Sequence, residues 1–321
     1  MKDIEVFASI CKKISSSPLW IQGPGGNVSV KMDDSKMIVK ASGSELAEVN
    51  ETKGYAYVSR NYFLDGWKKI KSSGKTVVES EVAYSSLVYL SNEDTKSYPR
   101  PSMELGFHAI LDFKYVFHFH SLASLVACYY YTEKQSDILL EILKNDSDIF
   151  FEPFHMPGFR ICEPMETISS SSLEKDSIII FLANHGVILA TNSTPFYFIE
   201  NFQKWEEAFW DKNFEIPYKK MNERKFLYEF ASLELVDGKE LFPDSVILAD
   251  RIKKVTNPGL EGGLKLKASY EIKDKGAADL FAIHSVIKRL VPDFPSLSQE
   301  SIQELISLPT EIARKKLVDK K

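Results

Sequence analysis

The sequence predicts a folded α/β protein with one large domain and a smaller C-terminal extension. Helical periodicity alternates with short strand-like runs in the first two thirds of the chain, and lysine-rich helical stretches follow Pro217. At 321 residues the chain exceeds the size, about 250–300 residues, at which a single core usually stops growing. We therefore predict a domain at 1–216 and a mainly helical extension at 217–321.

Composition and charge exclude several classes of protein. Hydrophobic residues make up 44% of the chain and charged residues 26%, which is the ordinary balance of a globular protein. The 40 basic and 45 acidic residues give a net charge of −5, so neither nucleic acid nor a membrane surface is an expected partner. The sequence shows neither an apolar run long enough for a membrane span nor a secretory signal. The three separated cysteines (Cys11, Cys128 and Cys162) predict reduced thiols and a cytoplasmic protein.

The first part of the chain predicts one helix followed by short strands. An amphipathic helix is expected at 1–17, and a glycine-rich turn leads into an alternating, strand-like segment at 27–31. Two further strands are expected at 37–41 and 54–59, because both are β-branched or aromatic runs bounded by turn residues. The segment 80–90 is helix-like.

The middle of the chain predicts buried strands framed by helices. A helix is expected at 103–111, with Ser102 as its N-cap. A strand at 114–120 is expected to run into a helix at 121–131. The segment 176–182 is a continuous apolar run, which is typical of a strand buried on both faces.

The remaining helices are less informative about function. The aromatic-rich helix expected at 195–214 has the spacing of a core helix. Helices are also expected around 221–233 and at 298–319. His284 stands alone on a helix expected in the extension, where we expect a structural role.

Three of the six histidines stand at strand ends. His118 and His120 alternate along one expected strand, so both imidazoles point to the same face and can converge on one ion. His185 follows the apolar run at 176–182, between Asn184 and Gly186, which favour a close bend. Three imidazoles suit a catalytic zinc site with one open position. The pair alone predicts two unrelated histidines rather than a metal site, and the third strand-end histidine changes this in favour of a metal site.

Glu104 is a candidate acid or base. It is expected near the start of the helix at 103–111, where the helix dipole stabilises an ionised carboxylate. His108 lies four residues further on the same helical face, where it can hold Glu104 by a hydrogen bond or simply pack. An ordinary helix-start carboxylate is the alternative for Glu104.

Three small turns offer hydrogen-bond donors to an anion. The turn at 23–27 can expose successive backbone N–H groups as a nest for phosphate. Ser42 with Gly43 forms a second donor-rich turn, and Ser102 marks a third. Each is also compatible with an ordinary turn. Dinucleotide, P-loop and serine-hydrolase motifs are absent from the sequence.

Taken in order, these motifs resemble the class II aldolase/adducin family. They are Gly-Gly-Asn27-Val-Ser, Ala-Ser42-Gly43, Arg-Pro-Ser102-Met-Glu104 with His108, His118-Phe-His120 and Asn-His185-Gly186, within residues 3–215. The longer forms Gly-Pro-Gly-Gly-Asn-Val-Ser-Val-Lys and His155-Met-Pro-Gly-Phe look most like the aldolase module of rhamnulose-phosphate aldolase/dehydrogenase-type proteins. Fuculose-phosphate aldolase is also similar.

The resemblance implies a three-layer α/β/α sandwich with a largely antiparallel central sheet, usually assembled as a homotetramer with active sites between subunits. It implies a class II aldolase-like catalytic domain at 1–216 and leaves the role of 217–321 open. The implied cofactor is a divalent metal, zinc first, with manganese or another divalent ion as alternatives. The implied partner is a small sugar or sugar phosphate.

The resemblance also implies a role for each site residue. His118, His120 and His185 would bind the metal and Glu104 would transfer protons. His155 falls near a catalytic tyrosine of fuculose-phosphate aldolase. Contacts to substrate or phosphate are implied for Gly25, Gly26, Asn27, Ser42, Gly43 and Ser102. Met103 stands where the family often has a second serine, which removes one phosphate donor.

The predicted activity is that of a metal-dependent aldolase, a carbon–carbon lyase. Retro-aldol cleavage leaves an enediolate, whose negative oxygens a divalent cation stabilises while Glu104 exchanges a proton with the carbanion carbon. A sugar-phosphate epimerase or dehydratase on the same site is one alternative. A non-catalytic, adducin-like binding or scaffold module is the other, although loss of catalysis should remove ligands that this chain keeps.

Overall fold

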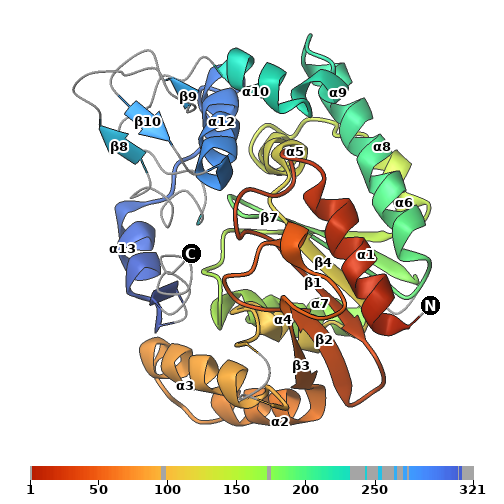
Figure 1. The fold of residues 1–321 in the computed structure, drawn as a ribbon, viewed down its shortest axis with the longest axis vertical. Helices are drawn as coiled ribbons and strands as arrows, with labels where there is room; N and C mark the ends of the chain where they lie inside the picture. The colour runs from red at the N-terminus through yellow and green to blue at the C-terminus, as the bar shows by residue number, and fades with distance from the viewer. Residues whose placement is uncertain are drawn as a thin grey trace.

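Seven strands form the central sheet. The computed structural model describes residues 2–94, 99–171, 175–231, 243, 252–254, 264–265, 270–272, 275–309 and 311–312. The strands are β1 (Asn27–Lys31), β2 (Lys36–Lys40), β3 (Tyr55–Ser59), β4 (Tyr115–Phe119), β5 (Asp148–Glu152), β6 (Ser177–Leu182) and β7 (Gly186–Thr191). Their order is β3-β2-β1-β4-β7-β6-β5, and only the β5–β6 pair is parallel (Figure 1). The predicted largely antiparallel sheet is therefore confirmed.

Helices cover both faces of this sheet. They are α1 (Asp3–Ser15), α2 (Arg60–Lys71), α3 (Val77–Leu90), α4 (Leu105–Ile110), α5 (Leu122–Thr132), α6 (Glu141–Lys144), α7 (Glu163–Ser171) and α8 (Pro195–Asn213), with single 3-10 turns at Leu46–Glu48 and Arg160–Cys162. Phe117 and Phe119 of β4 belong to a core with α1, α5 and α8. Val116, whose side chain points to the opposite face of the sheet, belongs to a second core with α2, α3, α4 and α7. This confirms the three-layer sandwich.

Helix α4, which carries the site residues, is held by a buried lysine. Lys31 ends β1, and its ammonium group donates to the carbonyl oxygens of His108 (3.0 Å), Leu111 (2.7 Å) and Phe113 (2.6 Å). The last carbonyls of a helix lack partners within the helix, so a cation there satisfies them and interacts favourably with the helix dipole. Burial lowers the pKa of Lys31 to about 7. Its side chain thereby ties α4 to the strand beside the site.

The start of α4 differs from the prediction. The helix begins at Leu105, and its N-cap residue is Glu104, whereas Ser102 was the predicted N-cap. The Ser102 hydroxyl instead accepts a hydrogen bond from the backbone N–H of Glu104 at 3.3 Å. Serine commonly forms this bond two residues ahead in a turn, and here the turn delays the helix.

Several elements were not anticipated from the sequence, above all α2, α7, β5 and β7. Strand β7 was not expected, because its first residue, Gly186, follows directly on the tight turn at 183–185 and glycine is typical of the end of a structured segment. The aromatic-rich helix expected at 195–214 is confirmed as a core helix, since Phe202, Trp205 and Phe209 of α8 are fully buried. The predicted free thiols are confirmed: all three cysteines are unpaired and buried.

The C-terminal extension is mainly helical. It contains α9 (Tyr218–Met221), α10 (Arg224–Ala231), α12 (Lys275–Leu290), α13 (Gln299–Ser307) and a small sheet of β8 (Ile252–Lys254), β10 (Tyr270–Ile272) and β9 (Leu264–Lys265), in that order. Apolar side chains of α12 join the same core as α5 and α8. The domain boundary at residue 216 stays a prediction.

Two predicted helices reach past the described residues. The helix expected around 221–233 corresponds to α9 and α10, and residues 232–233 lie outside the description. The helix expected at 298–319 is wrong as one continuous helix: α13 ends at Ser307, because Leu308 has an extended backbone, and residues 310 and 313–319 lie outside the described residues. His284 is buried in α12, as expected of a structural residue. Within the described ranges, every helix is too short or too polar to cross a bilayer.

Candidate active site

Strand topology brings the predicted site residues to one end of the sheet. Strand β4 lies between β1 and β7 and is antiparallel to both, so its end meets the start of each. Asn27, the first residue of β1, pairs with His118, and Val187 near the start of β7 pairs with Phe119. His120 and His185 therefore lie at the same end of these strands, although 65 positions separate them in the sequence.

The three histidines converge. One ring nitrogen from each of His118, His120 and His185 lies within 4.8 Å of the others, and all three side chains are buried. The Nε2 atoms of His118 and His120 are 3.1 Å apart. The Nδ1–H of His118 donates to the Val187 carbonyl at 3.0 Å, which leaves Nε2 as the lone-pair nitrogen. Burial lowers the pKa of His118 to about 3, so the imidazole is neutral and competent to bind a metal.

This donor set fits a divalent cation. Three neutral imidazoles match the ligand number and type of catalytic zinc, and they also accept other transition ions. The Oε1 atom of Glu104, which faces Nε2 of His185 at 3.3 Å, is buried and has no hydrogen-bond partner in the described part of the chain. A buried polar atom without a partner is costly unless a ligand or water satisfies it. The predicted ligands are thus brought together in an arrangement that suits a metal.

A tight turn carries His185 to the other two histidines. Asn184 has a φ of 54° and Gly186 a φ of 142°. A Cβ atom on Gly186 would lie 2.4 Å from the carbonyl oxygen of Phe119 and 3.0 Å from the Cα of His120. Only glycine allows the turn to approach the end of β4 this closely.

Glu104 lies beside the histidines. Its Oε1 atom is 3.3 Å from Nε2 of His185, and its Oε2 atom is 3.7 Å from Nε2 of His118. Burial by itself would raise the pKa of the Glu104 carboxyl, but the adjacent histidine cluster, with His185 at 3.3 Å, lowers it below its usual range. The group is thus a carboxylate next to the metal ligands, as a proton acceptor requires.

A buried hydrogen-bond chain orients Glu104. The Asn27 amide donates to Oε2 of Glu104 at 2.6 Å, and its oxygen contacts Nε2 of His108. The Nδ1 atom of His108 contacts the Ser29 hydroxyl at 2.8 Å. Both ring nitrogens of His108 are engaged, so His108 holds Glu104 through Asn27 and not directly. The Asn27 amide group is thus hydrogen-bonded to Glu104 and His108. A contact between Asn27 and substrate stays a prediction.

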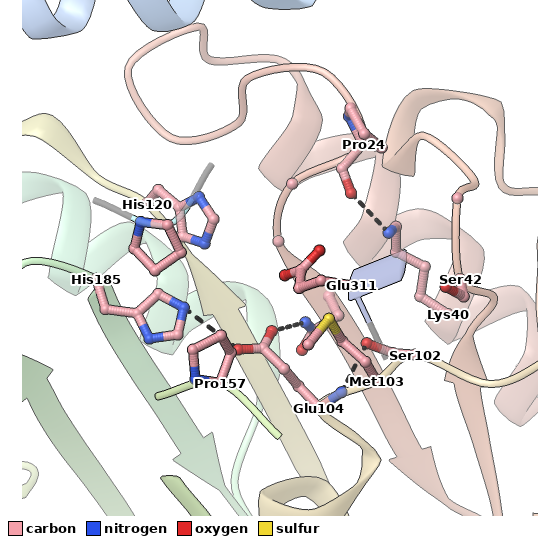
Figure 2. Close-up of a pocket in the computed structure, with 15 residues that line it drawn as sticks. Pro24, Lys40, Ser42, Ser102, Met103, Glu104, His120, Pro157, His185 and Glu311 are labelled. Atoms are coloured by element: carbon pink, nitrogen blue, oxygen red, sulfur yellow. Dashed lines mark hydrogen bonds and ion pairs between the residues drawn. The ribbon is translucent and has the colours of Figure 1, made fainter. Parts of the chain in front are cut away.

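These residues open onto a small pocket (Figure 2). It is lined by Pro24, Gly25, Gly26, Asn27, Lys40, Ser42, Gly43, Ser102, Met103, Glu104, His120, Pro157, His185, Pro243 and Glu311. All six predicted contacts to substrate or phosphate are in this lining. The pocket therefore joins two of the three predicted metal ligands, His120 and His185, to the donor-rich turns in one cavity.

The second and third donor turns meet through a short bridge. Ala41 pairs with Pro101, and the N–H of Ser42 donates to the Arg100 carbonyl at 2.8 Å. This pairing sets Ser42 and Ser102 side by side at the pocket. The Ser42 hydroxyl is buried and has no hydrogen-bond partner among the described residues. It is a donor available to a ligand.

Three lining residues were missed by the sequence reasoning. Lys40 ends β2, is buried, and donates to the Pro24 carbonyl at 3.0 Å. Its position directly before Ala-Ser42-Gly43 is the signal that could have found it. Pro243 and Glu311 come from the extension, and no sequence motif marks either of them.

His155 lies outside the pocket lining. Its Nε2 atom is 3.1 Å from the Glu152 carboxylate, and the side chain remains 25% exposed. The pocket is reached instead by Pro157 of the same segment. A catalytic role for His155 stays a prediction. Met103 does line the pocket, so the position where the family often has a second serine is apolar here.

Known proteins share this fold. Residues 5–208 match the class II aldolase and adducin N-terminal domain. The N-terminal class II aldolase domain of a conserved protein from Thermoplasma acidophilum is 23% identical over 64% of this chain and 93% of its own, with a TM-score of 0.50. YgbL from Klebsiella pneumoniae is 18% identical over 65% of this chain and 88% of its own, with a TM-score of 0.44. An L-fuculose 1-phosphate aldolase is 18% identical over 68% of this chain and 90% of its own, with a TM-score of 0.42. None of the curated proteins matches the sequence. Since the family match spans more than half of the chain, this protein belongs to the class II aldolase and adducin family.

Proposed function

We propose that this protein is a metal-dependent lyase that cleaves or forms a carbon–carbon bond in a sugar or sugar phosphate. The observation that carries the proposal is an ionised carboxylate, Glu104, within 3.7 Å of two of three convergent imidazoles. We also propose zinc as the metal and a homotetramer as the assembly, both implied by the family.

The residues divide the chemistry between them. A divalent ion held by the three histidines would supply a Lewis acid that stabilises the oxygens of an enediolate. Glu104 would take the proton from the donor carbon, and in cleavage would return it to the same carbon. The amide of Asn27 keeps one carboxylate oxygen in place for this transfer. Lys40, Ser42 and Ser102 would bind the polar end of the substrate.

Solvent exchange tests the proposed proton transfer. Dihydroxyacetone phosphate is incubated with the zinc-loaded protein in deuterated water, and proton NMR follows the hydroxymethyl group. The proposal predicts deuterium at this carbon, because Glu104 would remove one proton reversibly in the absence of an aldehyde acceptor. Absence of exchange with metal bound would contradict aldolase chemistry on this donor.

Epimerase and dehydratase activities are the alternatives within the same site. Both can use a metal and a carboxylate, so product analysis with ketose phosphates distinguishes them from an aldolase. Cleavage yields two carbonyl fragments, epimerisation keeps the carbon chain and dehydration releases water.

The adducin-like scaffold is the alternative without catalysis. The retained histidines and Glu104 speak against it, because a scaffold does not need a buried carboxylate among three imidazoles. Elemental analysis of protein purified without chelator, together with unfolding in the presence of added zinc or manganese, tests this alternative. A ligand at 100 times its Kd stabilises the folded state by about 2.7 kcal/mol. No bound metal and no stabilisation would favour the scaffold.

A further inference from the structure

The C-terminal extension places a carboxylate in the pocket. Glu311 lines the pocket with only 1% of its surface exposed, and it follows α13, far from the other lining residues in the sequence. In the view of Figure 2 it lies between the histidines and Lys40. Pro243 of the extension also lines the cavity. Two side chains of the extension thus complete a pocket that the first domain otherwise builds.

Specific contacts hold α13 beside the pocket. Arg160 forms an ion pair with Glu304 of α13 at 3.1 Å. Leu305 and Leu308 pack in a separate apolar cluster with Met156, one residue before the lining residue Pro157. The turn that carries His185 also contacts the extension, because the Asn184 amide donates a hydrogen bond to the carbonyl of Pro295 at 2.8 Å. The position of Glu311 therefore follows from docking of the extension on two segments of the site.

The pocket is nearly full with the extension in this position. The space open to the centre of a water molecule is about 20 Å³, which accommodates about one water. Its polar wall contains the groups suited to an anion, namely the ammonium of Lys40, the free hydroxyl of Ser42, Ser102 and the glycine-rich turn at 23–27. A phosphate group needs more room than remains here.

We propose that Glu311 occupies the anion-binding end of the pocket, so that a phosphorylated ligand binds only by displacing this carboxylate. A carboxylate and a phosphate are both anions, so they are attracted to the same cations and repel each other when both are present. Glu311 also acts electrostatically on Arg100, a further cation near this wall. Glu311 is thus a specificity-determining residue that weakens phosphate binding. The inference rests on the anion-binding part of the proposed function.

Phosphate binding tests this inference. Inorganic phosphate is titrated calorimetrically into the zinc-loaded full-length protein and into Glu311→Gln, which removes the charge and keeps the size of the side chain. We expect the Kd for phosphate to fall at least tenfold in Glu311→Gln. Glu311→Asp, which keeps the charge, should bind phosphate within about threefold of the parent.

Two further variants show where the phosphate binds. Glu300→Gln removes the same charge from an exposed position of α13 and should leave the Kd unchanged. Lys40→Met in the Glu311→Gln background should abolish the tenfold gain, because Lys40 belongs to the proposed anion site. Thermal unfolding checks that each variant is folded. Glu311→Gln binding no tighter than the parent, or a gain equal to that of Glu300→Gln, would overturn the inference.

The two proposals fail in different ways. Phosphate affinity is measured without turnover, so it responds to Glu311 even in a protein that catalyses no reaction. Deuterium exchange in the parent protein with no change of phosphate affinity in Glu311→Gln would overturn only the inference. The expected gain in affinity without any exchange would contradict only the proposed aldolase activity.

Discussion

Gly186→Ala should damage the proposed metal site through the backbone alone. The added Cβ would lie 2.4 Å from the Phe119 carbonyl oxygen and 3.0 Å from the Cα of His120, both backbone atoms that cannot rotate away. The turn or the end of β4 must therefore shift, and either shift separates His185 from His120. The φ of 142° at Gly186 is an additional cost for any residue with a Cβ.

The expected magnitude follows from a matched control. Gly74 has a φ of 64° and nothing within 4 Å of its added Cβ, so Gly74→Ala carries the conformational cost alone, about 1–2 kcal/mol. Gly186→Ala adds steric overlap in a packed region, which typically costs about 1–3 kcal/mol more. Displacement of His185 should also weaken zinc binding by about 10-fold or more, as loss of ligand orientation commonly does.

Urea unfolding with and without zinc measures both effects. The free energy of unfolding of apo Gly186→Ala should lie below that of apo Gly74→Ala, and zinc should restore less stability to Gly186→Ala. The reasoning is refuted if the two variants unfold alike and bind zinc with equal affinity. Such a result would mean that the turn carrying His185 relaxes without cost.

Three further predictions concern the buried polar groups. Glu104→Gln should lower deuterium exchange into dihydroxyacetone phosphate by about 10²–10⁴-fold with unchanged zinc content, and retained exchange would assign the proton transfer to another group. Asn27→Ala removes the partner of Glu104 and His108, so urea unfolding should show a loss of about 1–3 kcal/mol; an unchanged midpoint would contradict the hydrogen-bond chain. Burial lowers the pKa of His284 to about 4, so the unfolded chain binds its proton first and stability falls as the pH drops from about 6.5 towards 4. Between pH 7 and 5 the parent should therefore lose about 2 kcal/mol more unfolding free energy than His284→Leu, and equal slopes would disprove this contribution.

Local patterns predicted most of the sheet and the three histidines that converge. The apolar run of β6 and the alternation of His118, in β4, with His120, directly after it, are properties of neighbouring residues, and the structure has the strand and the converging histidines as expected. The start of α4 was wrong by two residues, since the turn bond from Ser102 competes with helix capping. Strand β7 was missed because Gly186, which the sequence assigns to the bend, is already its first residue.

The sequence by itself determined which residues have metal-ligating and proton-transferring chemistry, because residue type and short-range spacing are local properties. Only the tertiary structure decided that β1 and β7 flank β4, which brings Asn27 and His185 to the same edge as His118. It alone joined Asn27 to Glu104 and placed Glu311 in the pocket. These contacts cross 77 to more than 200 positions of the chain, and they arise when the sheet pairs and the extension docks. No local periodicity carries information about such pairings, since burial of apolar faces and strand pairing select them only in the complete fold.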